Sequence, residues 1–272
     1  MLPDRAVVAI INATPDSFYT GCGVMPDKEA LRCAILRAVE EGADLLDVGG
    51  CSTRPDSLPP TVEEEWQRVA CALKIVREVA PDLPLSVDTY RSEVARRAIE
   101  AFDATMINDI SGGTLDNDMW PLVAQTGVLY VATHLRGEPA TMQRLATYSD
   151  VVEEVTAELE LLLQRMTEAG IAPRQLILDP GFGFAKDAAQ NYALVAGLER
   201  LKGLGCPLMV GISRKSMLYK PLGLTPDEVL PATTALHWEL LQRGANYLRV
   251  HDVAAARQTI DLYTYYAKTT QL

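Results

Sequence analysis

Polar and ionisable residues recur at one end of a series of short apolar segments. The segments span residues 7–12, 45–49, 85–88, 105–109, 128–134, 175–179, 208–213 and 247–251, and they finish on Asn12, Gly49–Gly50, Asp88, Asn108–Asp109, His134, Asp179, Ser213 and His251. Carboxylate and amide groups at Asp88, Asn108 and Asp179 suit a donor-rich ligand, because a carboxylate accepts paired N–H groups bidentately. An aminopyrimidinone ring offers such a pair. We therefore predict that these three side chains bind it together.

Basic residues follow the last two segments. Lys215 lies in the Ser213-Arg-Lys-Ser216 sequence, and Arg249 and His251 are separated by one residue. Side chains two apart in a strand share a face. The three residues are therefore expected to form a cationic cluster that holds a pyrophosphate, whereas His134 is left ambiguous and His237 is interpreted as structural.

Two earlier loops add candidates of weaker specificity. Asn12 begins the sequence Asn-Ala-Thr-Pro-Asp, where its amide suits a hard cation or a phosphate, although the same residue types are common in turns. Arg54 lies in Gly49-Gly-Cys-Ser-Thr-Arg-Pro-Asp56, where two glycines permit close backbone approach and the guanidinium suits an anion. A solvated surface arginine is the alternative for Arg54.

The segments alternate with amphipathic stretches, which sets the expected architecture. Helices are predicted over residues 27–41, 62–79, 91–102, 117–125, 151–169, 188–204, 226–243 and 253–267, several of them ending near Gly42, Gly127, Gly170, Gly205 and Gly244. Eight strand-then-helix units predict one (β/α)8 (TIM) barrel domain over residues 1–272, with every strand tip on the catalytic face. A doubly wound sheet is the alternative, weakened by the lack of a glycine-rich nucleotide loop.

Composition narrows the class of protein. The chain has 272 residues, 48% of them hydrophobic, and a formal net charge of −11, which disfavours nucleic acid as a partner. No apolar run is long enough for a membrane span, and the start lacks a signal-peptide pattern, so we expect a cytoplasmic protein. Five scattered cysteines predict neither a disulfide framework nor structural zinc.

Seven motifs in order resemble one family, dihydropteroate synthase. They are Ile11-Asn-Ala-Thr-Pro-Asp-Ser-Phe18, Asp47-Val-Gly-Gly-Cys-Ser-Thr-Arg-Pro55, Ser86-Val-Asp-Thr89, Ile107-Asn-Asp109, Leu178-Asp-Pro-Gly-Phe-Gly-Phe-Ala-Lys186, Gly211-Ile-Ser-Arg-Lys-Ser216 and Leu248-Arg-Val-His-Asp252. The resemblance implies condensation of 6-hydroxymethyl-7,8-dihydropterin diphosphate with p-aminobenzoate. It also implies a homodimer formed through outer helices and inhibition by sulfonamides.

The resemblance also implies roles for individual residues. The pterin would be bound by Asp88, Asn108, Asp179 and Lys215. The diphosphate would be held by Asn12 with Mg2+, Arg54, Arg249 and His251. The p-aminobenzoate pocket would consist of Thr53, Pro55, Phe184, Lys215 and Ser216. Catalysis would depend on Asp88, Lys215, Arg249 and His251.

The expected mechanism is dissociative. Loss of pyrophosphate leaves a cation at the pterin methylene, which Asp88 stabilises, and the neutral aniline nitrogen then attacks. The chain shows no arrangement typical of a protein nucleophile, and the first two βα loops are expected to close over the diphosphate.

Three positions depart from the family pattern. Cys51 stands where the family usually has Glu, Asp56 where it has Gly, and Thr133-His-Leu135 where it has Met-His-Met. Two alternatives are a corrinoid-linked methyltransferase barrel acting on methyltetrahydrofolate, which needs no pyrophosphate site, and a non-catalytic pterin-binding paralogue.

Overall fold

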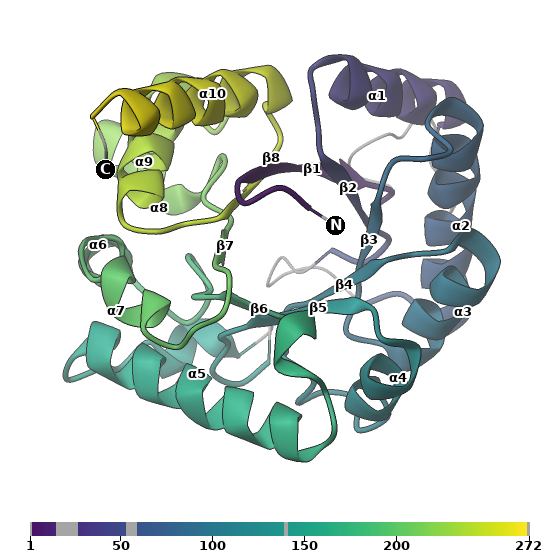
Figure 1. Cartoon of the computed structure of the whole chain (residues 1–272), viewed down its shortest axis with the longest axis horizontal. Coiled ribbons are helices and arrows are strands. Elements are labelled where there is room, and N and C mark those ends of the chain that lie inside the picture. Colours follow the sequence, from purple (N-terminus) through teal and green to yellow (C-terminus); the bar gives the residue numbers. More distant parts are fainter. Residues whose placement is uncertain (1, 15–26, 53–58, 139–140, 271–272) are drawn as a thin grey trace.

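The computed structural model describes residues 2–14, 27–52, 59–138 and 141–270, and within them eight parallel strands form the barrel seen end-on in Figure 1. The order of pairing is β6-β5-β4-β3-β2-β1-β8-β7, and a bridge between Leu178 and Leu208 brings the two ends of this sheet together. The expected (β/α)8 fold is confirmed. The strands are β1 (Ala6–Asn12), β2 (Leu45–Gly49), β3 (Leu85–Asp88), β4 (Met106–Asp109), β5 (Leu129–Thr133), β6 (Leu176–Asp179), β7 (Met209–Val210) and β8 (Tyr247–Val250).

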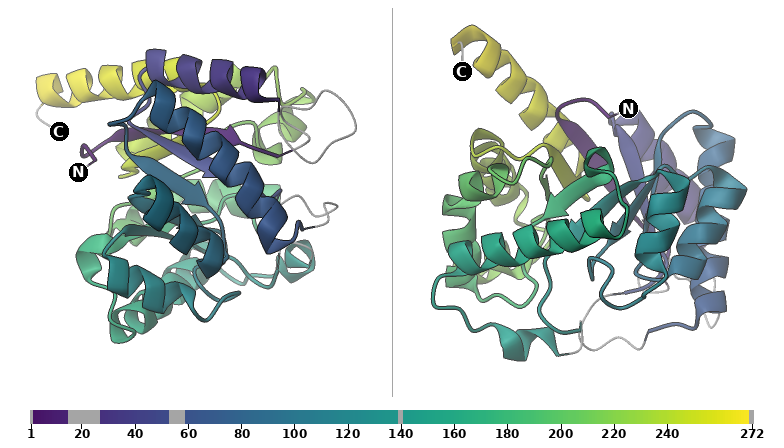
Figure 2. Two further views of the ribbon diagram at one scale, coloured as in Figure 1. Left: turned by 90° about the vertical axis from the view of Figure 1, so that its right-hand side faces the viewer. Right: turned by 60° about the horizontal axis from the view of Figure 1, so that its bottom comes forward.

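Helices surround the strands on all sides (Figure 1) and run alongside them in the side view (Figure 2). They are α1 (Lys28–Glu40), α2 (Val62–Val79), α3 (Ser92–Phe102), α4 (Met119–Thr126), α5 (Val151–Glu168), α6 (Ala188–Ala196), α7 (Leu198–Lys202), α8 (Ser216–Leu222), α9 (Leu230–Gln242) and α10 (Val253–Thr270), with 3-10 turns η1 (Met142–Leu145) and η2 (Pro173–Gln175). The helix predicted over 62–79 has the same bounds in the structure.

Two separate apolar cores fix which way each strand residue points. A small cluster fills the barrel itself and includes Val8, Leu45, Met106 and Ile177, whereas a large cluster lies between the strands and the helices. Because strand side chains alternate between faces, residues two or four positions along the strand from a barrel-filling residue also point into the barrel. This alternation directs the polar strand tips inward.

Local sequence signals explain where helices begin and end. Thr61 and Glu64 form a capping box at the start of α2, and Asp150 accepts hydrogen bonds from two backbone N–H groups at the start of α5. All five glycines predicted near helix ends adopt positive φ, a backbone conformation that favours glycine.

Three elements differ from expectation. The helix predicted over 188–204 is divided into α6 and α7 at Gly197, where an added Cβ would lie 2.5 Å from Val152 of α5. The helix predicted over 226–243 begins only at Leu230, with Pro231 in its first turn. The helix α8, which has seven residues and contains Pro221, was not predicted. The spacing of apolar residues in the sequence reveals neither the close packing of Gly197 against Val152 nor a helix as short as α8.

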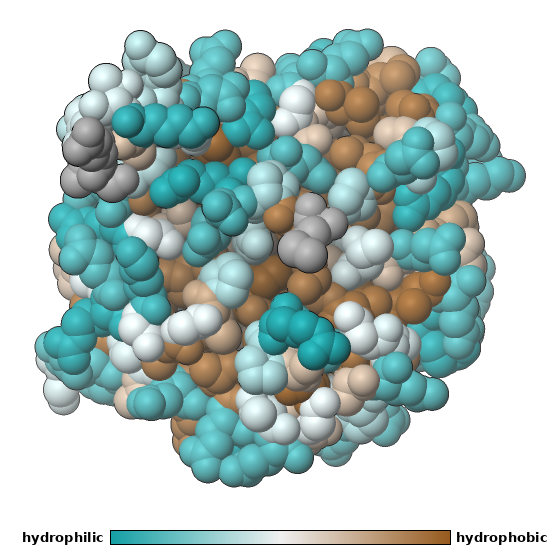
Figure 3. All heavy atoms as spheres, viewed as in Figure 1, coloured by the Kyte–Doolittle hydropathy of each residue, from teal (hydrophilic) through white to brown (hydrophobic). Residues whose placement is uncertain are grey.

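The outer surface is largely polar. On the face shown in Figure 3, hydrophilic side chains cover most of the helices, and apolar atoms show between them. The C-terminal half of α10 projects beyond the body of the barrel (Figure 2). No helix within the described part of the chain is long and apolar enough to span a bilayer.

Candidate active site

Polar side chains line the carboxyl-terminal mouth of the barrel. Asn12 follows the barrel-filling Val8 by four residues, Asn108 follows Met106 by two, and Asp179 follows Ile177 by two. The same alternation places Arg249 and His251 with Tyr247 on the interior face of β8. Two of the predicted pterin residues, Asn108 and Asp179, and three of the predicted diphosphate residues therefore face the mouth of the barrel.

Arg249 joins two carboxylates inside this mouth. Its Nε donates to Asp47 Oδ2 and its Nη2 to Asp88 Oδ2, both at 2.6 Å. Asp47 Oδ2 also accepts a hydrogen bond of 2.9 Å from Asn108 Nδ2. Four strands, β2, β3, β4 and β8, are thereby tied together by charge-assisted hydrogen bonds.

The charge states follow from burial and pairing. Burial raises the pKa of Asp88, and Arg249 opposes that rise. Burial works against the charge of Arg249 too, but the carboxylates of Asp47 and Asp88 hold its pKa above the usual value. Arg249 is thus a permanent cation in contact with the carboxylate proposed to face the pterin, rather than a cation grouped only with Lys215 and His251.

Lys215 approaches the mouth from the loop after β7. Its Nζ donates to the Phe182 carbonyl at 2.5 Å and lies 4.3 Å from the centroid of the Phe184 ring. Burial lowers the pKa of Lys215 to about 8, with Asp179 opposing the shift. The ammonium form therefore predominates at pH 7, next to the aromatic ring predicted to contact p-aminobenzoate.

His251 does not have the charge that the sequence led us to expect. Its Nδ1 lies 3.1 Å from Ser213 Oγ, and its pKa is lowered to about 4 by desolvation and then by Arg249 and Arg214, although part of the residue remains exposed. At neutral pH the free protein presents a neutral imidazole. The predicted cationic cluster consists of Lys215 and Arg249, with His251 available as a hydrogen-bond donor.

Several predicted residues lie on or near segments that are not placed. Thr53, Arg54, Pro55 and Asp56 are outside the described residues, and so are residues 15–26, which include most of the first βα loop. Cys51 is half-buried, and its pKa is raised to about 11 by burial and by Glu65, so its thiol stays protonated. Ser216 is half-buried as the first residue of α8.

Sequence reasoning did not assign roles to four residues around the mouth. Asp47 is fully buried in the middle of β2, and Lys186 is buried with its Nζ 3.0 Å from His134 Nδ1. His134 Nε2 in turn lies 2.9 Å from Glu158 Oε2. A charged residue inside an apolar strand was a usable signal for Asp47. The contacts of Lys186 and Glu158 with His134 join positions 52 and 24 residues apart, which spacing does not reveal.

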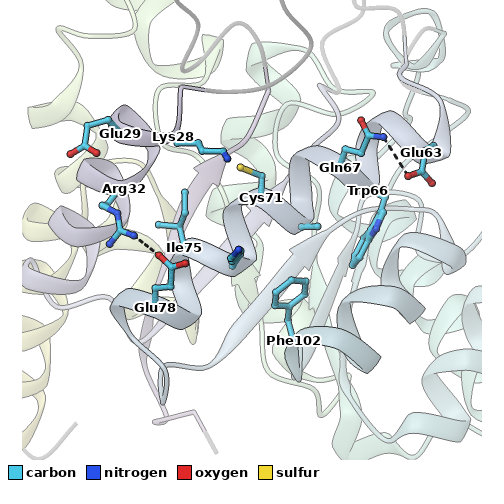
Figure 4. Close-up of a pocket in the computed structure, with 12 residues that line it drawn as sticks. Lys28, Glu29, Arg32, Glu63, Trp66, Gln67, Cys71, Ile75, Glu78 and Phe102 are labelled. Carbon is cyan, nitrogen blue, oxygen red and sulfur yellow. Dashed lines mark hydrogen bonds and ion pairs between the residues drawn. The ribbon is translucent and has the colours of Figure 1, made fainter.

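A groove of about 720 Å³ lies on the outer wall between α1, α2 and the end of α3, away from the strand tips (Figure 4). Trp66, Ile75 and Phe102 contribute apolar surface, while Arg32 and Glu78 form an ion pair on its rim. Acidic and basic side chains alternate around the groove, so its charge favours no class of ligand. The chemistry is concentrated in the mouth.

Comparison with known proteins places these residues in context. Residues 8–251 match the family model described as pterin binding enzyme. The dihydropteroate synthase of Synechocystis sp. is 41% identical over 256 residues, which cover 93% of this chain and 86% of that protein.

Two solved structures are similar over nearly the whole chain. The dihydropteroate synthase of Xanthomonas albilineans with 4-aminobenzoic acid is 41% identical, has a TM-score of 0.87, and the match covers 98% of this chain and 94% of that one. The same organism's enzyme has also been solved with 7,8-dihydropteroate. The Yersinia pestis enzyme with a sulfonamide drug is 33% identical, with a TM-score of 0.89 and coverage of 97% and 94%.

Proposed function

The chain belongs to the family of pterin-binding enzymes, and from this premise we propose that it is a dihydropteroate synthase. It joins 6-hydroxymethyl-7,8-dihydropterin diphosphate to p-aminobenzoate, giving 7,8-dihydropteroate and pyrophosphate. The single observation that carries the proposal is the mouth itself, where the acceptors Asp88, Asn108 and Asp179 face the same space as the cations Lys215 and Arg249. Because Arg249 is already paired with Asp47 and Asp88, Lys215 is the cation of this pair that remains available to a diphosphate.

The residue roles follow from this chemistry. Asp179 and the amide oxygen of Asn108 accept hydrogen bonds from the pterin, and Asp88 stabilises the positive charge that develops at its methylene. Lys215, Arg249 and His251 face the departing pyrophosphate, with Arg54 as a further predicted cation. Phe184, Lys215 and Ser216, with Thr53 and Pro55, form the p-aminobenzoate pocket, where sulfonamides compete.

The reaction is proposed to be dissociative. The C–O bond breaks first, with both electrons leaving on pyrophosphate. The aniline nitrogen then uses its lone pair to form the C–N bond and releases one proton. No side chain has to act as a nucleophile, and the charged residues act by placing opposite charge next to each developing ion.

Mg2+ is proposed as the cofactor. The described residues contain no cluster of three or more His, Cys, Asp or Glu side chains suited to a metal ion. That fits magnesium, which commonly takes one or two protein ligands together with substrate phosphates. Asn12, at the inward-facing end of β1, is the proposed protein ligand, and the bound ion would neutralise charge on the diphosphate.

Assembly and location complete the proposal. We infer a homodimer, supported by apolar side chains exposed on the outer helices, and a cytoplasmic location, as expected for folate biosynthesis. Leu262 and Tyr265 of α10 are 60% and 71% exposed. Exposed apolar residues that cluster on one surface are typical of a contact with another protein.

The deciding experiment measures pyrophosphate release with pterin diphosphate and Mg2+, with and without p-aminobenzoate. Release that depends on p-aminobenzoate and falls at least a hundredfold in Lys215→Ala is the expected result, since transition-state electrostatics of this kind are worth about 3 kcal/mol. Lys202→Ala, at an exposed lysine on α7, is the control and should match the wild type. Pterin binding without turnover would instead identify a non-catalytic paralogue.

A further inference from the structure

The loop after β6 forms a tight turn that supports two substrate-facing groups. Gly181, Gly183 and Ala185 have φ of 70°, 81° and 48°, and Phe184 N donates to the Gly181 carbonyl at 3.0 Å. The turn presents the Phe182 carbonyl to Lys215 and the Phe184 ring to the same ammonium group. Its position therefore decides where Lys215 and Phe184 lie.

The side chain of Lys186 stabilises this turn through hydrogen bonds to its backbone. The side chain is buried, and its Nζ donates to the Gly181 and Phe184 carbonyls, each at 3.1 Å, and to His134 Nδ1 at 3.0 Å. An ammonium group has three N–H donors, so all of them are used. The two carbonyls are the first and last of the turn, and Lys186 fixes the distance between them.

His134 anchors Lys186 to the outer layer of the fold. Because the Glu158 carboxylate can only accept, the ring proton of His134 lies on Nε2, which donates to Glu158 Oε2 at 2.9 Å, and Nδ1 of the neutral ring accepts from Lys186. Glu158 belongs to α5 and is also bound by Arg136. The His134 backbone N–H donates to the Asp179 carbonyl at 2.9 Å. The row Glu158–His134–Lys186 thus connects α5 to the turn.

Charge states support this arrangement. Burial lowers the pKa of His134, which favours the neutral ring that the accepting Nδ1 requires. Burial also lowers the pKa of Lys186 to about 7, while the carboxylate of Asp179 opposes the shift, so the ammonium form with three donors makes up roughly half of the population at pH 7 and more below it. A buried lysine that lacked acceptors would be costly, and the three short contacts are what offset its desolvation.

We propose that Lys186 is a positioning residue for p-aminobenzoate, which it controls through the Gly181–Phe184 turn with His134 as its support. The proposal rests on the assignment of Phe184 and Lys215 to the p-aminobenzoate pocket. Lys186 itself touches no reacting atom. Its loss should affect the second substrate more than the pterin, because the pterin acceptors Asp88 and Asn108 lie on strands distant from the turn. Asp179 is the pterin acceptor that is linked to the turn, since its carboxylate accepts a hydrogen bond of 2.7 Å from Gly181 N.

Two pairs of variants distinguish an effect of Lys186 on the position of the turn from an effect on the stability of the whole protein. Lys186→Met keeps the length of the side chain and removes its donors, and Lys202→Met, at an exposed lysine of α7, is the matched control. His134→Leu removes the acceptor for Lys186, whereas His134→Asn places an amide oxygen near the position of Nδ1. KM for each substrate, kcat and the melting temperature would be measured for all four and for the wild type.

Lys186→Met and His134→Leu are expected to raise KM for p-aminobenzoate about tenfold or more, as for the loss of a charged hydrogen bond. KM for the pterin diphosphate should rise less, and His134→Asn should reverse most of the increase in KM for p-aminobenzoate. Equal changes in both KM values that track the melting temperature, or no change in either, would overturn the proposal. Failure of the synthase function would differ, because the wild type itself would then show no turnover.

Discussion

Arg249 is the residue on which the charge balance of the mouth depends. It is 19% exposed and contacts Asp47, which is fully buried, and Asp88. Arg249→Met would leave both carboxylates unpaired, and loss of one partner of a buried ion pair typically costs about 3–5 kcal/mol. We expect a loss of that size in the free energy of unfolding, measured by urea denaturation, together with loss of turnover.

The double variant Asp47→Asn with Arg249→Met provides the control for this prediction. Because it removes one of the two stranded carboxylates, it should recover part of the lost stability while remaining inactive. If the two substitutions were additive, the contact between Asp47 and Arg249 would contribute nothing to stability.

His237 is a buried histidine that should make the protein sensitive to acid. It is 2% exposed, its ring nitrogens have no hydrogen-bond partner among the described residues, and burial lowers its pKa from 6.5 to about 4. Above pH 6.5 the ring is neutral in both states. As the pH falls from there towards 4, the unfolded chain binds a proton that the folded chain does not, so stability decreases, by about 2 kcal/mol at pH 5.

His237→Met should remove this component. Urea denaturation of both proteins at pH 7 and pH 5 checks it: the variant should lose less stability between the two values than the wild type. Parallel losses would show that His237 does not titrate as its burial implies.

At the scale of elements, the loop after β6 depends on a glycine with no room for a side chain. Gly181 has a φ of 70°, and an added Cβ would lie 2.1 Å from the His134 carbonyl oxygen. Gly205 also has a positive φ, of 78°, but an added Cβ would meet nothing within 4 Å. The two positions share the backbone conformation and differ in packing.

Alanine substitution at each glycine should therefore distinguish the cost of a positive φ, which both positions have, from the cost of a steric clash, which only Gly181 has. Gly205→Ala is expected to cost about 1–2 kcal/mol, the price of a left-handed residue with a side chain. Gly181→Ala should cost more and also displace the turn, lowering the rate of product formation. Thermal denaturation and turnover test both variants, and similar effects at the two sites would contradict the steric argument.

The elements that the sequence predicted well are those governed by local signals. The bounds of α2 follow from its capping residues and its apolar spacing, and the strand tips were located by their polar ends. The break at Gly197 coincides with a close approach of Val152, far away in the chain, and β7 has two residues where a strand over 208–213 was predicted. The site residues divide in the same way. Asp88 and Asn108 were predicted because each ends an apolar strand, whereas Lys186 and Glu158 were not, because their contacts with His134 join residues remote in sequence.

At the scale of the whole molecule, the net negative charge of the protein opposes the approach of an anionic substrate to the site. A formal net charge of −11 repels an anionic diphosphate at long range, yet Lys215 and Arg249 present positive charge inside the mouth. Salt screens the interaction between two charges in a partly buried site less than it screens interactions with charges on the protein surface. Binding can therefore depend on the local cations while the overall charge keeps the protein soluble.

The outer wall of the barrel supplies the test of assembly. Leu262, Tyr265 and Tyr266 occupy positions i, i+3 and i+4 of α10, so they share one face of a helix that projects from the barrel (Figure 2). Tyr266 also lies 5.5 Å from Trp238 of α9, between ring centroids, which extends the apolar surface across two helices. A homodimer would bury this surface.

We expect the wild type to sediment with twice the mass of one chain, and the double variant Leu262→Glu with Tyr265→Glu to sediment as a monomer, because two charges would be buried without partners. Leu161→Glu is the matched control, since Leu161 is 57% exposed on α5, which lies across the barrel from α10 (Figure 1). This control should remain a dimer. A wild-type monomer at micromolar concentration, or a double variant that stays dimeric, would place the contact elsewhere or exclude it.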